Sequence, residues 1–513
     1  MRKNFDIPSI RKRLEGTYGK KYWRSLEEIA ETDEFQDFVK HEFPQGADQW
    51  LNPVTRRNFL KLMAASFAFG GLTACSANPP QKIVPYVRAP EELVPGKPLF
   101  YATAMPLGGV AMALLGESHE GRPTKVEGNP DHPASLGSTD ALSQASVLNL
   151  YDPDRSQIIS QGGMLTTWSA FVETLRGQLD GQRASGGAGL RIISETVTSP
   201  SLISLFQNVL QDFPQARWVQ YDPINRDNSK EGAMMAFGED VNTVYQFDQA
   251  EVIVSLDANF TQFGPGNVRY ARDFTDKRRV REDSTAMNRL YVMETQPSAT
   301  STLADHRLPL SSAQMEAFAR ALAAELGVDV EAPPAESLAA VPENWLGAIA
   351  RDLQANAGKS IVIVGENQAP VVHALAHAMN DALGNVGQTV IYSEPLEGTS
   401  TNQMQELRLL ADDMINDRVE VLLVIDANPV YNAPADTRFA EAIRRVPFRA
   451  KIGLYVDETG ALCEWNIPLS HYLESWFDAR AYDGVVSLTQ PLVDPLYSSK
   501  TAHQFVAAMI GQS

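Results

Sequence analysis

Short apolar runs alternate with amphipathic stretches through the second half of this chain. The runs that predict strands are Leu190–Ser194, Arg217–Gln220, Val252–Leu256, Arg289–Met293, Ser360–Val364, Thr389–Tyr392, Val421–Ile425 and Ile452–Val456. Most are apolar throughout, which is typical of strands buried on both faces. The stretches whose helical spacing predicts helices are Ser201–Phe213, Ala313–Leu326, Trp345–Ala355, Val371–Ala382, Met404–Met414 and Thr437–Arg445. This alternation predicts right-handed βαβ units and an α/β fold with doubly wound, mostly parallel sheets.

The same pattern divides the chain into segments. In chain order they are a region with helical spacing among charges (1–54), a segment with a continuous apolar run (55–75), a proline-rich linker (76–98), a small β-rich lobe (99–189), a first α/β block (190–330) and a second α/β block with a C-terminal segment (341–513). The prolines of the linker exclude a helix there.

The apolar run from Phe59 to Ala74 follows directly on the sequence Arg56-Arg57-Asn58-Phe59-Leu60-Lys61. The run is shorter than the roughly 20 apolar residues that a membrane-spanning helix needs. Arg56, Arg57, Phe59, Leu60 and Lys61 together resemble a twin-arginine (Tat) export signal, and the long region before them resembles an extended form of it. The resemblance implies export of a folded protein to the periplasmic, outer face of the cytoplasmic membrane. A buried helix of an ordinary domain is the alternative.

The apolar run ends in Leu72-Thr73-Ala74-Cys75, which resembles a bacterial lipoprotein cleavage box. Lipidation of Cys75 would attach the mature N-terminus to a membrane. Ordinary cleavage nearby, or no cleavage, stays open as the alternative, because the box is so short.

Composition changes the picture through charge and cysteine. The 513 residues are 44% hydrophobic and 21% charged, as in ordinary globular proteins, but the net charge is −19. So acidic a surface argues against nucleic acid as a partner and suits a basic protein, such as some cytochromes. The chain has two cysteines, Cys75 and Cys463. It therefore lacks the four thiolates of an iron–sulfur cluster and cannot form a cysteine-rich zinc site.

Two histidines four residues apart are candidate metal ligands. His373 and His377 lie in one predicted helix, where this spacing places both on one face. They could share a metal ion. We favour the simpler interpretation, a half-buried helix with two hydrogen-bonded histidines.

Polar residues follow several predicted strands and define a candidate pocket. Ligands of doubly wound sheets bind beyond the carboxyl ends of the strands, where the strand order reverses. The candidate cofactor-binding residues are Asp257, Asn259, Gly365, Asn367, Asp426 and Asn428. The alternative, which we favour, is that these side chains only cap the helices that follow.

The sequence Gly121-Arg122-Pro123-Thr124-Lys125-Val126-Glu127-Gly128-Asn129-Pro130-Asp131-His132-Pro133 by itself predicts a hairpin followed by a tight turn. It also resembles the N-terminal lobe of the molybdopterin-guanine-dinucleotide oxidoreductases. Further matching stretches are 150–155, 225–228, 263–272, 304–309, 380–387, 427–429 and 468–497. Together they resemble one branch of that family, the large extrinsic subunit of alternative complex III, a bacterial quinol:acceptor oxidoreductase.

This sequence also departs from the pattern of the family that it resembles. The cysteines that hold a cluster in family enzymes are absent, and no cysteine lies between Cys75 and Cys463 to bind molybdenum. Oxygen ligands for the metal remain conceivable, but nothing singles one out among Ser194, Thr196, Ser199 and Asp222. The resemblance therefore implies a fold that has lost molybdenum chemistry, with no catalytic residue, metal or cofactor in this chain. The cluster region that follows in the family is not in this sequence, so a split gene and a fragment are both open.

Our leading hypothesis from the sequence is an exported scaffold subunit of a membrane-associated quinol:electron acceptor oxidoreductase. The resemblance implies three kinds of partner: an iron–sulfur protein, a polytopic quinol-binding membrane subunit and a c-type cytochrome subunit. One alternative is an active molybdopterin reductase or dehydrogenase that binds molybdopterin guanine dinucleotide through a non-cysteine ligand, with clusters on another chain. A stand-alone periplasmic binding lipoprotein is the other.

Overall fold

The structure is a computed structural model, and it describes residue 94 and residues 96–281 and 286–511. Contacts divide the chain into two compact units, residues 1–91 and residues 92–513, and the fold described here is that of the second. The predicted export signal and Cys75 lie outside the described residues. Over the ranges described, no helix combines the length and apolar character that crossing a membrane requires.

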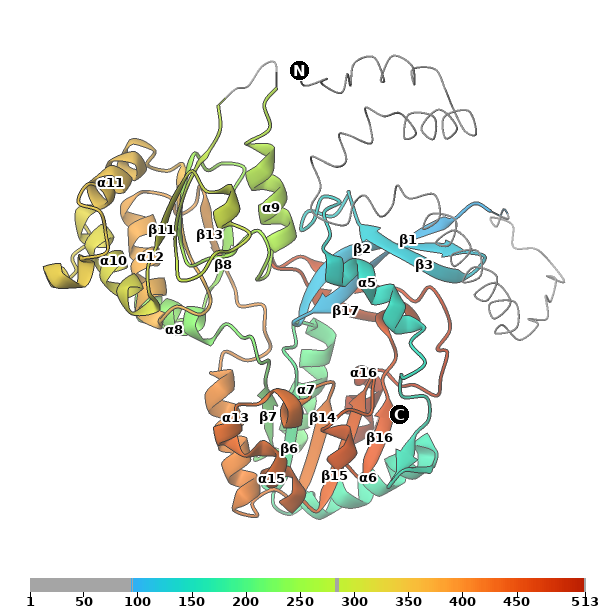
Figure 1. The fold of residues 1–513 in the computed structure, drawn as a ribbon. Coiled ribbons are helices and arrows are strands. Elements are labelled where there is room, and N and C mark those ends of the chain that lie inside the picture. The colour runs from blue at the N-terminus through green and yellow to red at the C-terminus, as the bar shows by residue number, and fades with distance from the viewer. Residues whose placement is uncertain (1–93, 95, 282–285, 512–513) are drawn as a thin grey trace, which may run out of the picture. The chain divides into compact units, whose positions relative to one another are not determined.

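An antiparallel three-stranded sheet begins the described chain (Figure 1). It consists of β1 (Leu99–Leu107), β2 (Val110–His119) and β3 (Arg122–Gly128), and helix α5 (Ala141–Leu150) packs against β3. The predicted hairpin and tight turn are both confirmed, since β2 and β3 pair antiparallel and the backbone doubles back after Gly128. Gly128 has to be glycine, because a Cβ there would lie 2.4 Å from the carbonyl oxygen of Ser138.

A seven-stranded sheet forms the larger α/β lobe, in the order β5-β4-β16-β15-β14-β6-β7. Its strands are β4 (Ser160–Gln161), β5 (Met164–Leu165), β6 (Leu190–Ser194), β7 (Arg217–Gln220), β14 (Val421–Ile425), β15 (Phe448–Gly453) and β16 (Trp465–Pro468). The helices of this lobe include α6 (Trp168–Arg183), α7 (Pro200–Asp212), α13 (Gln403–Ile415) and the C-terminal α16 (Ala502–Met509). Every residue of β6 and β14 is buried, as the continuous apolar runs predict.

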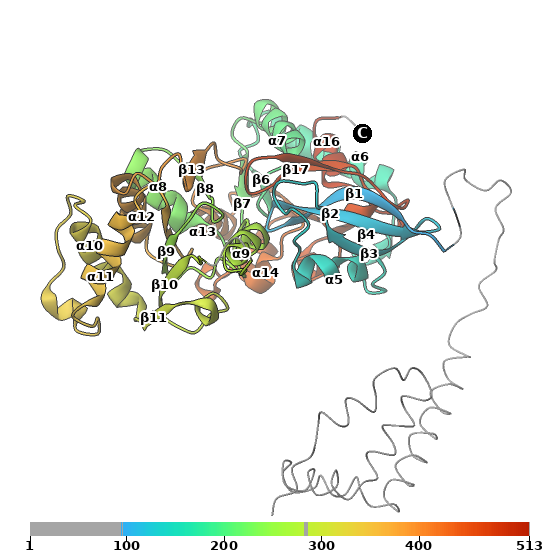
Figure 2. The ribbon, with the colours of Figure 1, turned by 90° about the horizontal axis from the view of Figure 1, so that it is seen from above.

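The smaller α/β lobe is inserted between β7 and α13. Its four-stranded parallel sheet has the order β11-β10-β9-β12, built from β9 (Val252–Leu256), β10 (Arg289–Glu294), β11 (His306–Pro309) and β12 (Ser360–Val364). Its helices are α8 (Asp227–Phe237), α9 (Asn267–Asp276), α10 (Ser312–Glu325), α11 (Trp345–Ala355) and α12 (Pro370–Ala382). Figures 1 and 2 both show α10 and α11 on the side of this lobe away from the N-terminal sheet.

The α/β fold class with mostly parallel, doubly wound sheets is confirmed, but the strands are not grouped as chain order predicts. β6 pairs with β14 from beyond the inserted lobe, and β7 joins the same sheet through β6, so neither pairs with β9 or β10. The run at Thr389–Tyr392 forms β13 (Val390–Ser393), which pairs antiparallel with β8 (Asn242–Tyr245) outside both parallel sheets. Apolar runs that look alike in sequence carry no information about which neighbour they join.

Two further local predictions were wrong. The strand expected over Ile452–Val456 is β15, Phe448–Gly453, because the charged Lys451 is buried inside it. The helix expected over Thr437–Arg445 is broken into short turns, because the backbone of Arg438 is left-handed with φ 51°. The C-terminal helix α16 buries Phe505 and Val506.

Candidate functional site

Each parallel sheet contains one point where the strand order reverses. In the larger lobe the chain runs from β6 outward to β7, whereas β14 flanks β6 on the opposite side. In the smaller lobe the chain runs from β9 to β10 and β11, and β12 flanks β9 on the opposite side. The carboxyl ends of β6 and β14, and of β9 and β12, are therefore the two candidate binding edges. The candidate pocket residues predicted from sequence all lie at these two edges.

The same three residues, Asp-Ala-Asn, follow the central strand at both edges. Asp257 follows β9 with φ 60°, and Asp426 follows β14 with φ 54°. Each donates its backbone N–H to the neighbouring strand, Asp257 to Met293 at 2.7 Å and Asp426 to Ile452 at 2.8 Å. The two lobes therefore use one backbone device to end their central strands.

The asparagines of these sequences hold neighbouring loops. The side-chain oxygen of Asn259 accepts hydrogen bonds from the backbone N–H and hydroxyl of Thr300, at 3.1 and 2.9 Å. The side-chain oxygen of Asn428 accepts the same pair from Thr459, at 3.2 and 2.7 Å. These oxygens are occupied by the protein itself. They stabilise the strand ends by contacts to the next loop, and not by capping the helix that follows in sequence.

The edge of the smaller lobe is closed by backbone packing. The Asp257 carboxylate accepts hydrogen bonds from the Thr295 N–H at 3.0 Å and from the Gln368 side chain at 2.7 Å. A Cβ on Gly365 would lie 2.1 Å from the Asp257 carbonyl oxygen, so only glycine allows β9 and β12 to end this close together. Asn367 is exposed beside them.

The edge of the larger lobe gathers carboxyl groups around one ammonium. Glu195 follows β6, at the place that Gly365 takes in the smaller lobe, and lies beside Asp426. The Lys451 side chain is 2% exposed, forms an ion pair with Asp457 and donates to the Ala427 carbonyl at 3.0 Å. Sequence analysis missed Glu195 and Lys451, because neither forms part of a recognisable motif.

Burial controls protonation at this edge. Burial raises the pKa of Asp426 to about 6, against the opposing effect of the Lys451 ammonium. Burial and then the Asp426 carboxylate raise the pKa of Glu195 well above its ordinary value. Burial also raises the pKa of Asp222, which follows β7, although hydrogen bonds from Thr196 oppose the shift. The edge is thus a set of coupled acids that hold protons more tightly than free carboxyl groups do.

The oxygen atoms considered as molybdenum ligands are engaged within the protein. The Thr196 hydroxyl donates to Asp222 and accepts from the Gln403 amide at 2.9 Å. The Ser194 hydroxyl donates to the Glu195 carbonyl at 2.7 Å. The Ser199 hydroxyl caps α7 and donates to the Asp478 carboxylate.

Molybdopterin guanine dinucleotide does not suit these edges. The cofactor carries a diphosphate, whereas the larger-lobe edge gathers the carboxyl groups of Glu195, Asp222, Asp426 and Asp457. The Lys451 ammonium is already paired with Asp457, so it is not free to bind a diphosphate. At the smaller-lobe edge, the backbones of Gly365 and Asp257 leave no room for a Cβ between them.

The predicted histidine helix is confirmed as α12. His373 and His377 are both buried, and burial lowers the pKa of each to about 4, so both are neutral. His377 shares a hydrogen bond of 2.8 Å with the Tyr392 hydroxyl, as expected, but the Nε2 atom of His373 has no hydrogen-bond partner. Over the described residues, no group of three or more His, Cys, Asp or Glu side chains is arranged to hold a metal ion.

The remaining cysteine within the fold is buried. Burial raises the pKa of the Cys463 thiol to about 12. The thiolate, which is the nucleophile and the metal ligand, is therefore disfavoured at neutral pH.

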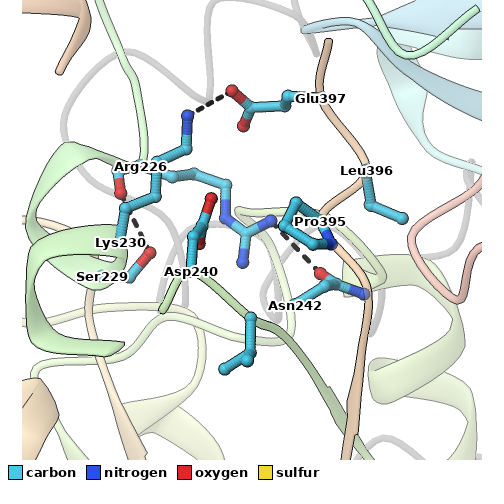
Figure 3. Close-up of a pocket in the computed structure, with 9 residues that line it drawn as sticks. Arg226, Ser229, Lys230, Asp240, Asn242, Pro395, Leu396 and Glu397 are labelled. Atoms are coloured by element: carbon cyan, nitrogen blue, oxygen red, sulfur yellow. Dashed lines mark hydrogen bonds and ion pairs between the residues drawn. The ribbon is translucent and has the colours of Figure 1, made fainter. Parts of the chain in front are cut away.

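A polar hollow lies where the segments that lead into and out of the inserted lobe meet (Figure 3). Lys230, from the start of the inserted lobe, forms an ion pair with Glu397 on the returning segment, and both side chains are about nine-tenths buried. Arg226 extends across the hollow toward the Asn242 side chain, at 3.4 Å. Sequence analysis singled out Arg226 within a matching stretch, but Glu397 carried no signal. These contacts fasten the crossing segments to each other.

A buried ion pair fastens the N-terminal lobe to the C-terminal segment. Arg155 donates to both carboxylate oxygens of Glu474, at 3.1 and 2.7 Å, and both side chains are almost fully buried. Glu474 also accepts from the backbone of His471 and Leu496. The stretch around Arg155 therefore supports the fold.

Known proteins are similar to this chain in sequence and in fold. No family model matches the chain. It is 28% identical over 452 residues to a protein described as "Menaquinone reductase, molybdopterin-binding-like subunit" from Nitratidesulfovibrio vulgaris (strain Hildenborough). That alignment covers 79% of this chain and 63% of the relative, so the chain spans less than two thirds of the relative's length.

Among solved structures, acetylene hydratase from Pelobacter acetylenicus is similar in fold. The TM-score is 0.61 at 12% sequence identity, over 80% of this chain and 69% of that one. An identity this low concerns the fold alone. The chain is therefore similar in sequence to a protein described as a molybdopterin-binding-like subunit, and similar in fold to acetylene hydratase.

Proposed function

We propose that this chain is an exported scaffold subunit of a membrane-associated, quinone-linked oxidoreductase of the alternative complex III type. The relative that it matches is described as a subunit of a menaquinone reductase, which supports a place in a quinone-linked complex. The Tat-like signal and Cys75 support export and attachment at the outer face of the cytoplasmic membrane. Its partners would be an iron–sulfur protein, a polytopic quinol-binding subunit and a c-type cytochrome.

The observation that carries the scaffold function is the chemistry of the two strand-end edges. One is closed at Gly365, and the other presents carboxyl groups where a dinucleotide would need cations. The candidate ligands Ser194, Thr196, Ser199 and Asp222 are all bonded within the protein. A polypeptide with this arrangement contributes shape and surface to a complex, while quinone chemistry and electron transfer take place on other subunits.

The test is a cofactor assay on the full chain purified from its native membrane. We expect molybdenum and tungsten well below one atom per chain by mass spectrometry, and no pterin fluorescence after acid oxidation. We also expect iron–sulfur and haem absorbance to copurify with the chain. Stoichiometric metal or pterin would establish the active molybdopterin enzyme instead, and a stable monomer without haem or iron would favour the stand-alone lipoprotein.

A further inference from the structure

An open groove of about 700 Å³ follows helix α12 on the surface of the smaller lobe. Its floor is one stripe of α12, Val371, Ala374 and Ala378, at the spacing that places side chains on one helical face. One wall is the end of α8, and the other is the loop that follows α10. Figure 1 shows α8, α10 and α12 gathered at the same end of this lobe. We call this feature the α12 groove.

The shape of the α12 groove suits a helix. Two alanines a turn apart leave the α12 backbone open to close approach, and side chains on both sides rise above this floor. The walls carry Met235 and Phe237 from α8 and Val328 and Val330 from the loop. A helix laid along α12 would place one face between these walls, which is the helix-in-groove mode of recognition.

The α12 groove leaves large apolar side chains in water. Met235 is 60% exposed, Phe237 43% and Val386 38%. The Phe237 ring packs edge-on against Tyr392, with ring centroids 4.9 Å apart, and this contact supports the wall of the groove. An exposed apolar patch of this kind, bordered by polar residues, is typical of a protein interaction site.

The charged side chains of the α12 groove are acidic in sum. Asp329 and Asp381 line it and are both exposed, whereas the Arg320 guanidinium is already paired with Glu316 at 2.8 Å. His377 is neutral and bonded to Tyr392. A binding segment with basic residues beside its apolar face would complement this rim, whereas a second copy of a chain with net charge −19 would be repelled.

We propose that the α12 groove docks one amphipathic helix of a partner subunit, with its apolar face between α8 and the loop and lysine or arginine beside Asp329 and Asp381. The inference deepens the proposed function, and rests on it, because it assigns a surface of the scaffold to a partner. It also gives the inserted lobe a task separate from the strand-end edges.

The first experiment identifies the occupant in the assembled complex. A photo-reactive benzoylphenylalanine is placed at Val386 in the full chain, with a matched control at the exposed Val280 of the same lobe. We expect irradiation to link position 386 to one partner peptide that carries apolar residues at helical spacing and lysine or arginine on the adjoining face. A link to a second copy of this chain, or to an acidic segment, would overturn the proposal.

The second experiment fills the α12 groove. Ala378→Arg puts bulk and positive charge on the floor, whereas Ala355→Arg makes the same change at an exposed position of α11, outside the groove. We expect the first variant to weaken binding of the partner subunit about tenfold or more, and the second to leave it unchanged. An intact complex with neither cross-link nor weakening overturns the groove proposal alone. A chain that purifies alone from its native membrane overturns both proposals.

Discussion

The two strand-end edges share a backbone and differ in chemistry. Both have Asp-Ala-Asn after the central strand, a left-handed aspartate and an asparagine bonded to a threonine. Gly365 closes the smaller-lobe edge, whereas Glu195 takes the corresponding place in the larger lobe. Register also places Val292 of the smaller lobe where the larger lobe has Lys451. The same backbone arrangement thus supports a tightly packed edge in one lobe and an ionisable edge in the other. Neither edge is suited to an anionic dinucleotide.

Removing the ammonium should have the largest effect on this comparison. Lys451→Met leaves Asp457 and its neighbours without their cation, so we expect the free energy of unfolding to fall by about 3–5 kcal/mol at pH 7. The loss should shrink near pH 5, where Asp426 and Glu195 are protonated. Urea unfolding at both pH values measures it, with Lys125→Met on the exposed hairpin as control. An equal loss at both pH values would contradict the assignment.

The closed edge should break when a side chain is added. Gly365→Ala forces its Cβ against the Asp257 carbonyl, so we expect a loss of about 1–3 kcal/mol, with no strong dependence on pH. Glu195→Ala is the matched change at the other edge, and it should cost much less, because it also removes a carboxyl group from a crowded set of acids. Thermal or urea unfolding distinguishes the two. Similar losses would show that the edges do not differ as described.

The ionisable edge should make stability depend on pH. Because the pKa of Asp426 rises to about 6 on folding, the folded chain binds this proton more tightly than the unfolded chain does. The contribution is complete below the unfolded pKa of about 4 and is lost as pH rises through about 6. A shift of about two pKa units amounts to roughly 3 kcal/mol. Asp426→Asn should flatten this part of the profile. An unchanged slope in this variant would contradict the comparison.

The shared asparagine contacts should give the smallest effect, equal in both lobes. Asn259→Ala and Asn428→Ala each remove an acceptor from two threonine donors, so each should lower the free energy of unfolding by about 1 kcal/mol. Equal changes in the urea midpoint would support one common device. A change in only one lobe would show that the repeated sequence hides two different roles.

Much of the local structure could be read from the sequence. Buried parallel strands such as β6 and β14 are apolar throughout, and helices such as α11 and α12 repeat their apolar residues at helical spacing. The helices α8 and α9 were missed, since polar residues fill much of their sequence and α9 begins directly after Gly266, a residue with φ 82°. The helix break at Arg438 depends on a left-handed backbone conformation, which the sequence does not indicate at a residue other than glycine.

The candidate site was predicted in part for a similar reason. Asp257, Asn259, Asp426 and Asn428 stand directly after apolar runs, so their place at the strand ends follows from chain order. Glu195 and Lys451 were not found, because their role depends on which strands become neighbours. Glu195 meets Asp426 only because β6 pairs with β14, more than two hundred positions away in sequence.

The sequence by itself determined the alternating elements, the shortage of thiols, the excess of negative charge and the resemblance to a molybdopterin-type fold. Periodicity is a local property of the sequence and composition is a sum over it, so both can be read without knowledge of the tertiary structure. Only the tertiary structure decided that one lobe is inserted into the other, that Gly365 closes one edge, that acids gather at the other and that α12 has an open groove. Each of these depends on the distance between residues far apart in the chain, which pairing and packing alone establish.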